Sequence, residues 1–298
     1  MSKPSSLTLA ASICACALML GGCSDTDAPG TAASKTNSAA PKAAAPAVNP
    51  NAAVVSSLAP QALQADLTTY WELNNGTEAA FIYNGKSPDP DSMPVLINAL
   101  GTGGYYRGTD ELSELFDKRS KTSDEFVKKD LEKEITPLLQ AQIDKFGGHA
   151  YYKQTLSAHT IDMQPYDFEK EEFPLTSTLF ASLEEQLRSA STPNKYKISN
   201  SQHHYLGFYD ARDFRMGFAN GERLKAIKVS GEEARAIEAV RAAQGGGNLE
   251  LRVYGYIGKT IKGDAKVTDK TRTVLMTAQY IELVDKNSPD HVLYHQTL

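Results

Sequence analysis

Residues 249–262 read LELRVYGYIGKTIK, and no other stretch of the chain indicates its structure so clearly. Leu249, Leu251 and Val253 alternate with polar or aromatic side chains, which is the period of a strand with one buried face. Gly255 and Gly258 interrupt the alternation, and glycines inside a strand mark a bulge or a strong bend. The stretch therefore predicts a long, bent strand.

The residues on either side predict the rest of an antiparallel meander. Residues 271–284 and 291–296 also favour strands, joined by a polar turn. Residues 230–243 favour a helix, because Ser230 and Glu233 have the spacing of a capping box and Gly245-Gly246-Gly247 follows. We expect this helix to lie over the meander.

Asn220-Gly221 predicts a hairpin earlier in the same half of the chain. It separates the alternating residues 214–218 from the apolar run 224–229. Asn-Gly is the dipeptide that two-residue hairpin turns prefer, because both positions need a positive φ. The two runs should therefore pair with each other.

Helical spacing is typical of the N-terminal half. Residues 63–71 place apolar side chains on one helical face, and Asn74-Asn75-Gly76 should end that helix. Two more helices are expected, from Thr109 to Arg119 and from Thr122 to Phe146. The second should kink or restart near Pro137, which cannot donate to the helical ladder.

These patterns predict one α+β domain over residues 58–298. Residues 58–148 should be mainly helical and pack on an antiparallel sheet formed by residues 149–298. The glycines of the long strand would allow that sheet to close partly into a barrel.

The first residues predict an export segment. Lys3 is followed by an uncharged apolar run, Leu7 to Leu20. Its length of about 14 residues suits a signal peptide and falls short of the roughly 20 that span a bilayer.

Leu20-Gly21-Gly22-Cys23 closes this segment and resembles the lipobox of bacterial lipoprotein precursors. The resemblance implies a signal peptide of residues 1–22, cleavage before Cys23, and a diacylglycerol on the Cys23 sulfur. A membrane partner is thus expected through the lipid on Cys23, since two or three acyl chains give stable anchoring. In such lipoproteins, an Asp directly after the lipid-bearing cysteine resembles an inner-membrane retention signal. This chain has Ser24 at that position, which favours the outer membrane facing the periplasm, although Asp25 is adjacent.

Composition limits what the mature chain can do. Cys14 and Cys16 leave with the signal peptide and Cys23 takes the lipid, so disulfides, thiolate metal sites and cysteine nucleophiles are excluded. Loss of Lys3 takes the formal charge from −5 to −6, which disfavours nucleic acid as a partner. Residues 23–57 lack aromatics and any apolar period, and they predict a disordered tether.

No motif indicates a metal, a cofactor or a catalytic residue. His203 and His204 are adjacent, and on a strand they would face opposite ways. His291 and His295 have a spacing that brings two ligands together on a helix, but the residues between them favour a strand. A site assembled from distant residues, such as His149, His159 and nearby carboxylates, stays open because such sites are defined by geometry.

Tyr254 and Tyr256 form the candidate contact surface. They share the outward face of the long strand, opposite its aliphatic residues. An open aromatic face would suit a protein or polymer partner. The alternative is that this face packs under the N-terminal helices.

A second resemblance is shorter. Tyr166-Asp167-Phe168 followed by Phe173-Pro174-Leu175 resembles stretches of exported bacterial proteins that carry no assigned activity. The sequence therefore favours a lipid-anchored, non-enzymatic envelope protein that binds another protein or an envelope polymer. The alternative hypothesis is a hydrolase of envelope material whose site is built from dispersed residues.

Overall fold

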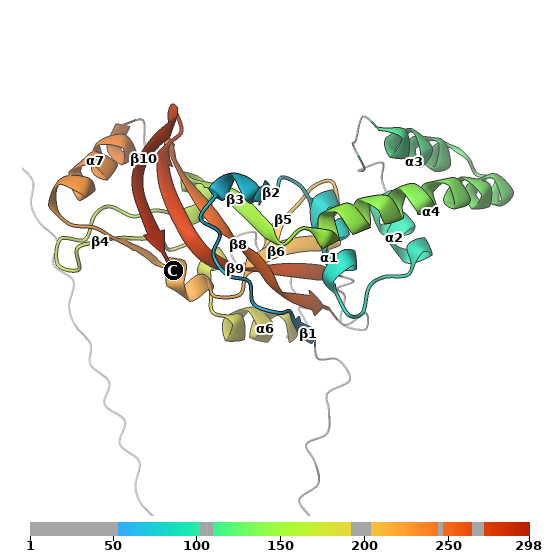
Figure 1. Ribbon diagram of the computed structural model, residues 1–298, viewed down its shortest axis with the longest axis horizontal. Coiled ribbons are helices and arrows are strands. Elements are labelled where there is room, and N and C mark those ends of the chain that lie inside the picture. The colour runs from blue at the N-terminus through green and yellow to red at the C-terminus, as the bar shows by residue number, and fades with distance from the viewer. Residues whose placement is uncertain (1–52, 102–105, 107–109, 192–203, 244–246, 264–270) are drawn as a thin grey trace, which may run out of the picture. The chain divides into compact units, whose positions relative to one another are not determined.

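Two long strands, β8 (Leu249–Lys262) and β9 (Arg272–Asp285), form the hairpin at the centre of the main sheet. They pair antiparallel from Leu249 opposite Asp285 to Lys262 opposite Arg272. Figure 1 shows this computed structural model, in which both strands curve along their length. The structure describes residues 53–101, 106, 110–191, 204–243, 247–263 and 271–298.

The hairpin has different neighbours along its two halves. The sheet runs in the order β2-β3-β8-β9-β6-β5, while β1 also pairs with β8 and β10 also pairs with β9. These strands are β1 (Val54–Ser57), β2 (Trp71–Glu72), β3 (Tyr151–Ser157), β5 (Leu206–Gly207), β6 (Phe214–Phe218) and β10 (Ser288–Thr297). On β8, β3 pairs with residues 250–256 and β1 with residues 259–262, so the two groups of strands meet at the middle of the hairpin.

The middle of the hairpin is irregular, as the glycines predict. The pairing of β8 with β9 shifts register between Tyr254 and Gly255 and again between Ile257 and Lys259. A Cβ on Gly255 would lie 2.1 Å from the carbonyl oxygen of Thr277, and one on Gly258 would lie 2.2 Å from the Thr277 hydroxyl oxygen. The close approach of the β9 backbone therefore requires Gly255, while at Gly258 the contact is with the Thr277 side chain.

Four helices make up most of the N-terminal half: α1 (Gly76–Lys86), α2 (Met93–Gly101), α3 (Glu111–Lys121) and α4 (Glu125–Gly148). Helix α1 packs on β6 and β9 on one side and on α4 on the other. Gly85 and Gly147 mark the crossing of the two helices, since a Cβ on Gly85 would lie 2.5 Å from the Cα of Gly147. Small residues at this point let the two backbones touch.

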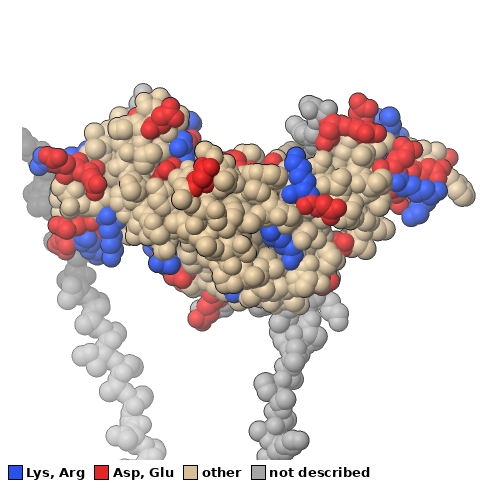
Figure 2. Space-filling view, viewed as in Figure 1, with Lys and Arg blue, Asp and Glu red and all other residues tan. Residues whose placement is uncertain are grey.

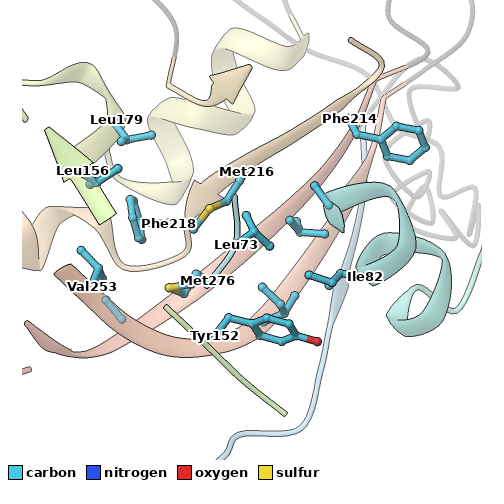
Figure 3. Close-up of a cluster of buried hydrophobic side chains, with 14 of the residues drawn as sticks. Leu73, Ile82, Tyr152, Leu156, Leu179, Phe214, Met216, Phe218, Val253 and Met276 are labelled. Atoms are coloured by element: carbon cyan, nitrogen blue, oxygen red, sulfur yellow. The ribbon is translucent and has the colours of Figure 1, made fainter. Parts of the chain in front are cut away.

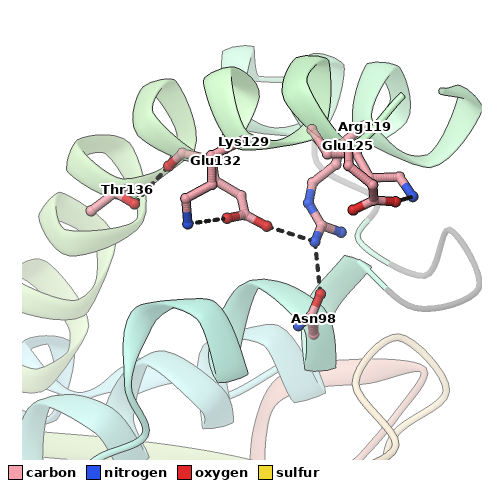
Figure 4. Close-up of polar contacts among 7 residues, drawn as sticks. Asn98, Arg119, Glu125, Lys129, Glu132 and Thr136 are labelled. Atoms are coloured by element: carbon pink, nitrogen blue, oxygen red, sulfur yellow. Dashed lines mark hydrogen bonds and ion pairs between the residues drawn. The ribbon is translucent and has the colours of Figure 1, made fainter. Parts of the chain in front are cut away.

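Arg119 ties the outer helices to one another (Figure 4). Its guanidinium donates to Asn98 Oδ1 on α2 at 2.7 Å and to Glu132 Oε1 on α4 at 2.9 Å. Hydrogen bonds from Arg119 and Lys129 lower the pKa of Glu132. One arginine on α3 thus holds α2 and α4 in place.

The remaining elements extend the sheet region. They are α5 (Ala158–Ile161), β4 (Glu172–Pro174), α6 (Leu183–Ser191), β7 (Ala226–Lys228), α7 (Gly231–Ala242) and the short 3-10 helices η1 (Leu67–Thr69), η3 (Thr178–Phe180) and η5 (Gly221–Leu224). Strands β4 and β7 form a separate two-stranded sheet, and α7 contacts β10.

The main core lies between the helices and one face of the sheet. Figure 3 shows part of it, with Ile82 of α1 near Tyr152 of β3 and Met276 of β9. Tyr152 is 1% exposed, and its hydroxyl donates to the carbonyl of His149 at 2.8 Å. The aliphatic side of β8 belongs to this core, as its alternation predicts.

The predicted α+β class is confirmed, but the sheet differs from the expected one. It is mixed, because β2 pairs parallel with β3 and β6 pairs parallel with β9. It is also open, since β2 and β5 stand at opposite ends of the strand order and do not pair with each other. Most strand pairs are antiparallel as expected, these two pairs are parallel, and the partial closure that the glycines would allow is not formed by the described strands.

The predicted hairpin at Asn220-Gly221 is also wrong. Strand β6 pairs with β9 and β5, while the following strand, β7, pairs with β4. Asn220 has φ −126°, so it does not make the positive-φ turn. Its side chain instead forms two hydrogen bonds of 2.9 Å with the backbone of Ala278 on β9, which outweighs the local turn preference.

Three N-terminal predictions need correction. Residues 63–71 form no long helix, because this segment is extended apart from the short η1, and Asn75 begins α1 instead of ending a helix. The predicted disordered tether included Val54–Ser57. These residues instead form β1, because they pair antiparallel with β8. Helix α4 does not restart near Pro137, because one helix runs from Glu125 to Gly148, and a kink at Pro137 stays a prediction.

Charged side chains are distributed unevenly. On the face shown in Figure 2 they gather over the α3–α4 end and around α7, with both signs mixed, and the surface between them is mostly uncharged. Within the described parts of the chain, no helix has the length and apolar character needed to cross a membrane.

We predict that Gly255→Ala lowers the free energy of unfolding by about 1–3 kcal/mol, because the added methyl group overlaps the Thr277 carbonyl. Urea denaturation followed by circular dichroism measures the change.

Gly207→Ala is the matched control, because a Cβ on Gly207 of β5 meets nothing within 4 Å. It should change stability by less than about 0.5 kcal/mol. Equal effects of the two substitutions would contradict the proposed role of the bend.

Candidate functional site

A cavity of about 420 Å³ opens at the N-terminal end of α1, and we call it the α1 pocket. Its volume lies in the range of small-molecule sites, which span about 300–1,000 Å³. Its lining residues are Asn75, Thr77, Glu78 and Phe81 at the start of α1, Tyr106 and Asp110 ahead of α3, Gln142 and Phe146 on α4, and Tyr209 and Asp210 ahead of β6.

The start of α1 is fixed by reciprocal caps. The N-cap residue Asn75 accepts a hydrogen bond from the Glu78 backbone N–H at 2.9 Å through Oδ1. The Glu78 carboxylate accepts from the backbone N–H of Asn74 at 2.7 Å. This is a variant of the capping box, and it holds the Glu78 side chain at the pocket wall.

Asp210 closes the same helix end from a distant part of the chain. Its carboxylate accepts from the backbone N–H groups of Gly76 and Thr77, each at 2.9 Å, and from the Thr77 hydroxyl at 2.7 Å. These three donors and the positive end of the helix dipole hold the Asp210 carboxylate in place. Asp210 is thus a fixed negative charge beside Glu78.

Glu78 lies in a different environment. Burial raises the pKa of its carboxyl, the hydrogen bonds from Asn74 and Asn75 oppose the shift, and the negative charge of Asp210 adds to it. The pocket therefore holds a carboxyl with a raised pKa beside a second carboxyl.

Aromatic rings form the apolar wall. Phe81 is 3% exposed, and its ring centroid is 5.6 Å from that of Phe146 on α4. Behind Phe146, Trp71 packs edge-on at 5.7 Å and stacks on His149 at 3.9 Å. Tyr209 stands at the rim with 65% of its surface exposed. The wall is rigid at its base and open at its rim.

The predicted contact surface at Tyr254 and Tyr256 is wrong, because their exposed fractions are 4% and 9%. Tyr70, from the extended segment ahead of β2, packs edge-on against Tyr254 at 5.4 Å. The Tyr254 hydroxyl donates to Glu282 at 2.8 Å. This face is therefore covered by a segment of extended chain. It is neither open nor packed under the N-terminal helices, the two alternatives expected from the sequence.

The two histidines proposed for a dispersed site do not come together. His149 and His159 flank the seven-residue strand β3, so they stand about 20 Å or more apart. The His149 ring makes a 3.0 Å hydrogen bond with the Thr69 carbonyl, and burial lowers its pKa. Its position is explained by packing on Trp71.

His159 lines a second cavity of about 460 Å³ together with Asp162, Ser177 and Tyr205. Asp162 has a φ of 49° and accepts a hydrogen bond from the Thr176 hydroxyl. The Ser177 hydroxyl caps η3 by accepting from the Leu179 N–H. Among the described residues no hydrogen bond joins His159 to Ser177 or Asp162, so these residues do not form a nucleophile–base pair.

The other predicted positions are placed as follows. Cys23, the signal segment and His203 lie outside the described residues. His204 bonds the Thr178 carbonyl at 3.0 Å. His291 and His295 lie on strand β10. Within the described ranges, no group of three or more His, Cys, Asp or Glu side chains could hold a metal ion.

The residues of the α1 pocket were missed from the sequence. Asn75 and Glu78 carry the Asn-x-x-Glu spacing of a helix start, which could have revealed α1. Nothing local indicates that Asp210, more than 130 residues later, completes that helix end.

Comparison with protein-family models, curated proteins and solved structures finds no match to this chain.

We predict that Glu78→Gln stabilises the protein at neutral pH relative to acid pH. The raised pKa means that the folded state holds the Glu78 proton more tightly than the unfolded state does. Its stability contribution is therefore fully present below the unfolded pKa and is lost as the pH rises through the folded pKa. Glutamine keeps an oxygen for the Asn74 N–H and cannot ionise.

The measurement is the difference in melting temperature between variant and native chain from pH 4 to pH 7.5. The difference should grow with pH in favour of Glu78→Gln. Glu114→Gln, on the exposed side of α3, is the control and should show no such trend. A difference that shrinks with rising pH would contradict the assignment.

Proposed function

We propose that this chain is a lipid-anchored protein of the bacterial cell envelope whose folded domain binds a ligand in the α1 pocket without transforming it. The ligand is a group presented by another protein or by an envelope polymer. Two independent features support the proposal: the export and lipobox residues at the N-terminus, and the preformed pocket in the folded domain.

The anchor follows from Leu20-Gly21-Gly22-Cys23 and the apolar segment before it. Acylation at Cys23 would hold the protein at the membrane, most simply the outer membrane facing the periplasm. The tether that composition predicts ahead of β1 would let the domain stand on the order of 30 Å from the bilayer. The pocket would then reach material in the periplasm.

The lining of the α1 pocket is the observation that carries the binding proposal. Among the described residues that line it there is no Cys, Ser, His or Lys. The Thr77 hydroxyl donates to Asp210, which also accepts from two backbone N–H groups, so both side chains serve to cap α1. Polar groups held by helix ends and a rigid aromatic wall suit recognition, because little order is lost when a ligand enters.

One observation favours a second function, hydrolysis of envelope material. Glu78, with its raised pKa, could serve as an acid, and Asp210 beside it could stabilise positive charge or orient water. A carboxyl with a raised pKa beside a second carboxyl is the pair that many glycoside hydrolases use. This hypothesis moves the dispersed site from the histidines to α1.

Cys23→Ala should abolish metabolic labelling of the protein with palmitate, and globomycin should cause the unprocessed precursor to accumulate in the native chain. Cys16→Ala, inside the apolar segment, is the control and should label normally. Unchanged labelling of Cys23→Ala would refute the anchor.

Binding and hydrolysis are separated by incubating the detergent-solubilised full-length protein with defined peptidoglycan fragments. We expect fragments retained by the protein to be recovered with unchanged masses, and Tyr209→Ala at the pocket rim to weaken retention several-fold, whereas Phe126→Ala, on an exposed residue of α4, should not. Mass-spectrometric detection of cleaved fragments, lost in Glu78→Gln, would establish the hydrolase instead.

A further inference from the structure

We infer that the α1 pocket recognises a protonated primary amine, with its aromatic wall holding the carbon skeleton that carries the amine. The inference rests on the proposed binding function of this pocket and names the chemistry of the ligand. It follows from the charge of the lining, from its hydrogen-bonding capacity and from the cations already placed on its rings.

The charge of the lining is one-sided. Glu78, Asp110 and Asp210 line the cavity, and the described lining residues include no Lys, Arg or His. The N-termini of α1 and α3 each offset about half a unit of negative charge. A net negative charge of about two therefore faces the cavity when all three carboxyls are ionised. A cation is the ligand that such a cavity favours.

The hydrogen-bonding capacity points the same way. Asp110 accepts from the Ser113 N–H at 3.1 Å and from the Tyr106 hydroxyl at 3.3 Å, and Glu78 accepts from the Asn74 N–H. A carboxylate has about four acceptor positions, so each keeps capacity for further donors. An ammonium group supplies three donors and no acceptor, which complements these oxygens.

Each of two rings that line the pocket already has a cationic side chain close to it. The Lys145 ammonium nitrogen is 5.3 Å from the ring centroid of Phe146, and the Arg212 guanidinium carbon is 5.1 Å from that of Tyr209. Neither cation is among the lining residues. Contacts of this length attract cations to ring faces, so the rings that bound the cavity add to the attraction of the carboxylates.

An amine has two sources in envelope material: an amino sugar and a lysine-like side chain. Both present an ammonium group on a carbon skeleton, and the pocket would recognise this shared group. Neutral acetylated forms lack the charge, and carboxylated forms would face three like charges, which is unfavourable at close range.

The test is a titration of the full-length protein in detergent with matched probes. Glucosamine, N-acetylglucosamine and glucuronic acid form the sugar series, and Nα-acetyl-lysine amide with its Nε-acetylated form is the peptide series. Saturation-transfer NMR detects binding. The protein has one tryptophan, Trp71, which packs on Phe146 of the pocket wall, so tryptophan fluorescence gives the affinities.

We expect the charged amine of at least one series to bind at least about tenfold more tightly than its acetylated counterpart, as loss of a charged hydrogen-bonding partner implies. Glu78→Gln, which keeps an acceptor for Asn74, should reduce amine affinity by about tenfold, and Asp110→Asn should also reduce it. Glu114→Gln on the exposed side of α3 is the control and should bind as the native chain does.

The amine affinity should also rise between pH 4 and pH 7 as the carboxyls ionise, while any binding of the acetylated probes stays level. Six other titratable or charged groups lie around the pocket that holds Glu78: Asp210, Asp110, Tyr106, Tyr209, Lys145 and Arg212. The Glu78→Gln variant measures how much of the pH dependence of amine affinity comes from Glu78. This dependence should weaken in that variant and not in Glu114→Gln.

Tighter binding of the neutral or anionic probes would overturn the amine inference and leave the binding function standing. Absence of binding by every amine probe at 10 mM, taken as about 200-fold above a Kd of order 50 μM, would also overturn it. Failure of the proposed function is seen separately, when peptidoglycan fragments are neither retained nor cleaved.

Discussion

The close approach of Thr277 to Gly255 and Gly258 is the contact on which the rest of the structure depends. A side chain at Gly255 would overlap the Thr277 carbonyl, so β8 and β9 could not come so near at mid-length, where the register shifts lie. The bend gives the hairpin two halves with separate neighbours, β3 and β10 on one and β1 and β6 on the other. Helix α1 packs on β9 and on β6, its neighbour in the sheet.

The pocket follows from that arrangement through two further contacts. The parallel pairing of β6 with β9 sets the position of the residues just ahead of β6, so Asp210 meets the N-terminus of α1. The contact between Gly85 and Gly147 sets how closely α4 lies on α1, so Phe146 meets Phe81. The charged and aromatic walls of the pocket thus come from separate long-range contacts, and each is rigid for its own reason. Under the proposed function, these fixed walls would lose little order when a ligand enters.

Local patterns failed where a distant partner competed for the same residues. Asn220 was expected to form a tight turn, yet its amide bonds Ala278 across the sheet. The apolar residues of the segment 63–71 have helical spacing, yet Tyr70 is used to cover Tyr254 and Trp71 to stack on His149. Val54 and Val55 lie in a stretch without an apolar period, yet they form a strand because they pair with β8. In each case the tertiary contact stabilises more than the local preference.

The sequence by itself determined the α+β class, the long strand and its bend, and the helices α3, α4 and α7, because these depend on periodicity and on residues within one element. It also determined the exclusion of thiol chemistry from residues beyond Cys23, since composition alone decides that. Only the tertiary structure decided that Tyr254 and Tyr256 are covered, that His149 and His159 lie at opposite ends of β3, and that Glu78 and Asp210 share a cavity. The physical reason is that burial and proximity arise from contacts between residues far apart in the chain. The spacing of residues along the sequence does not predict such contacts.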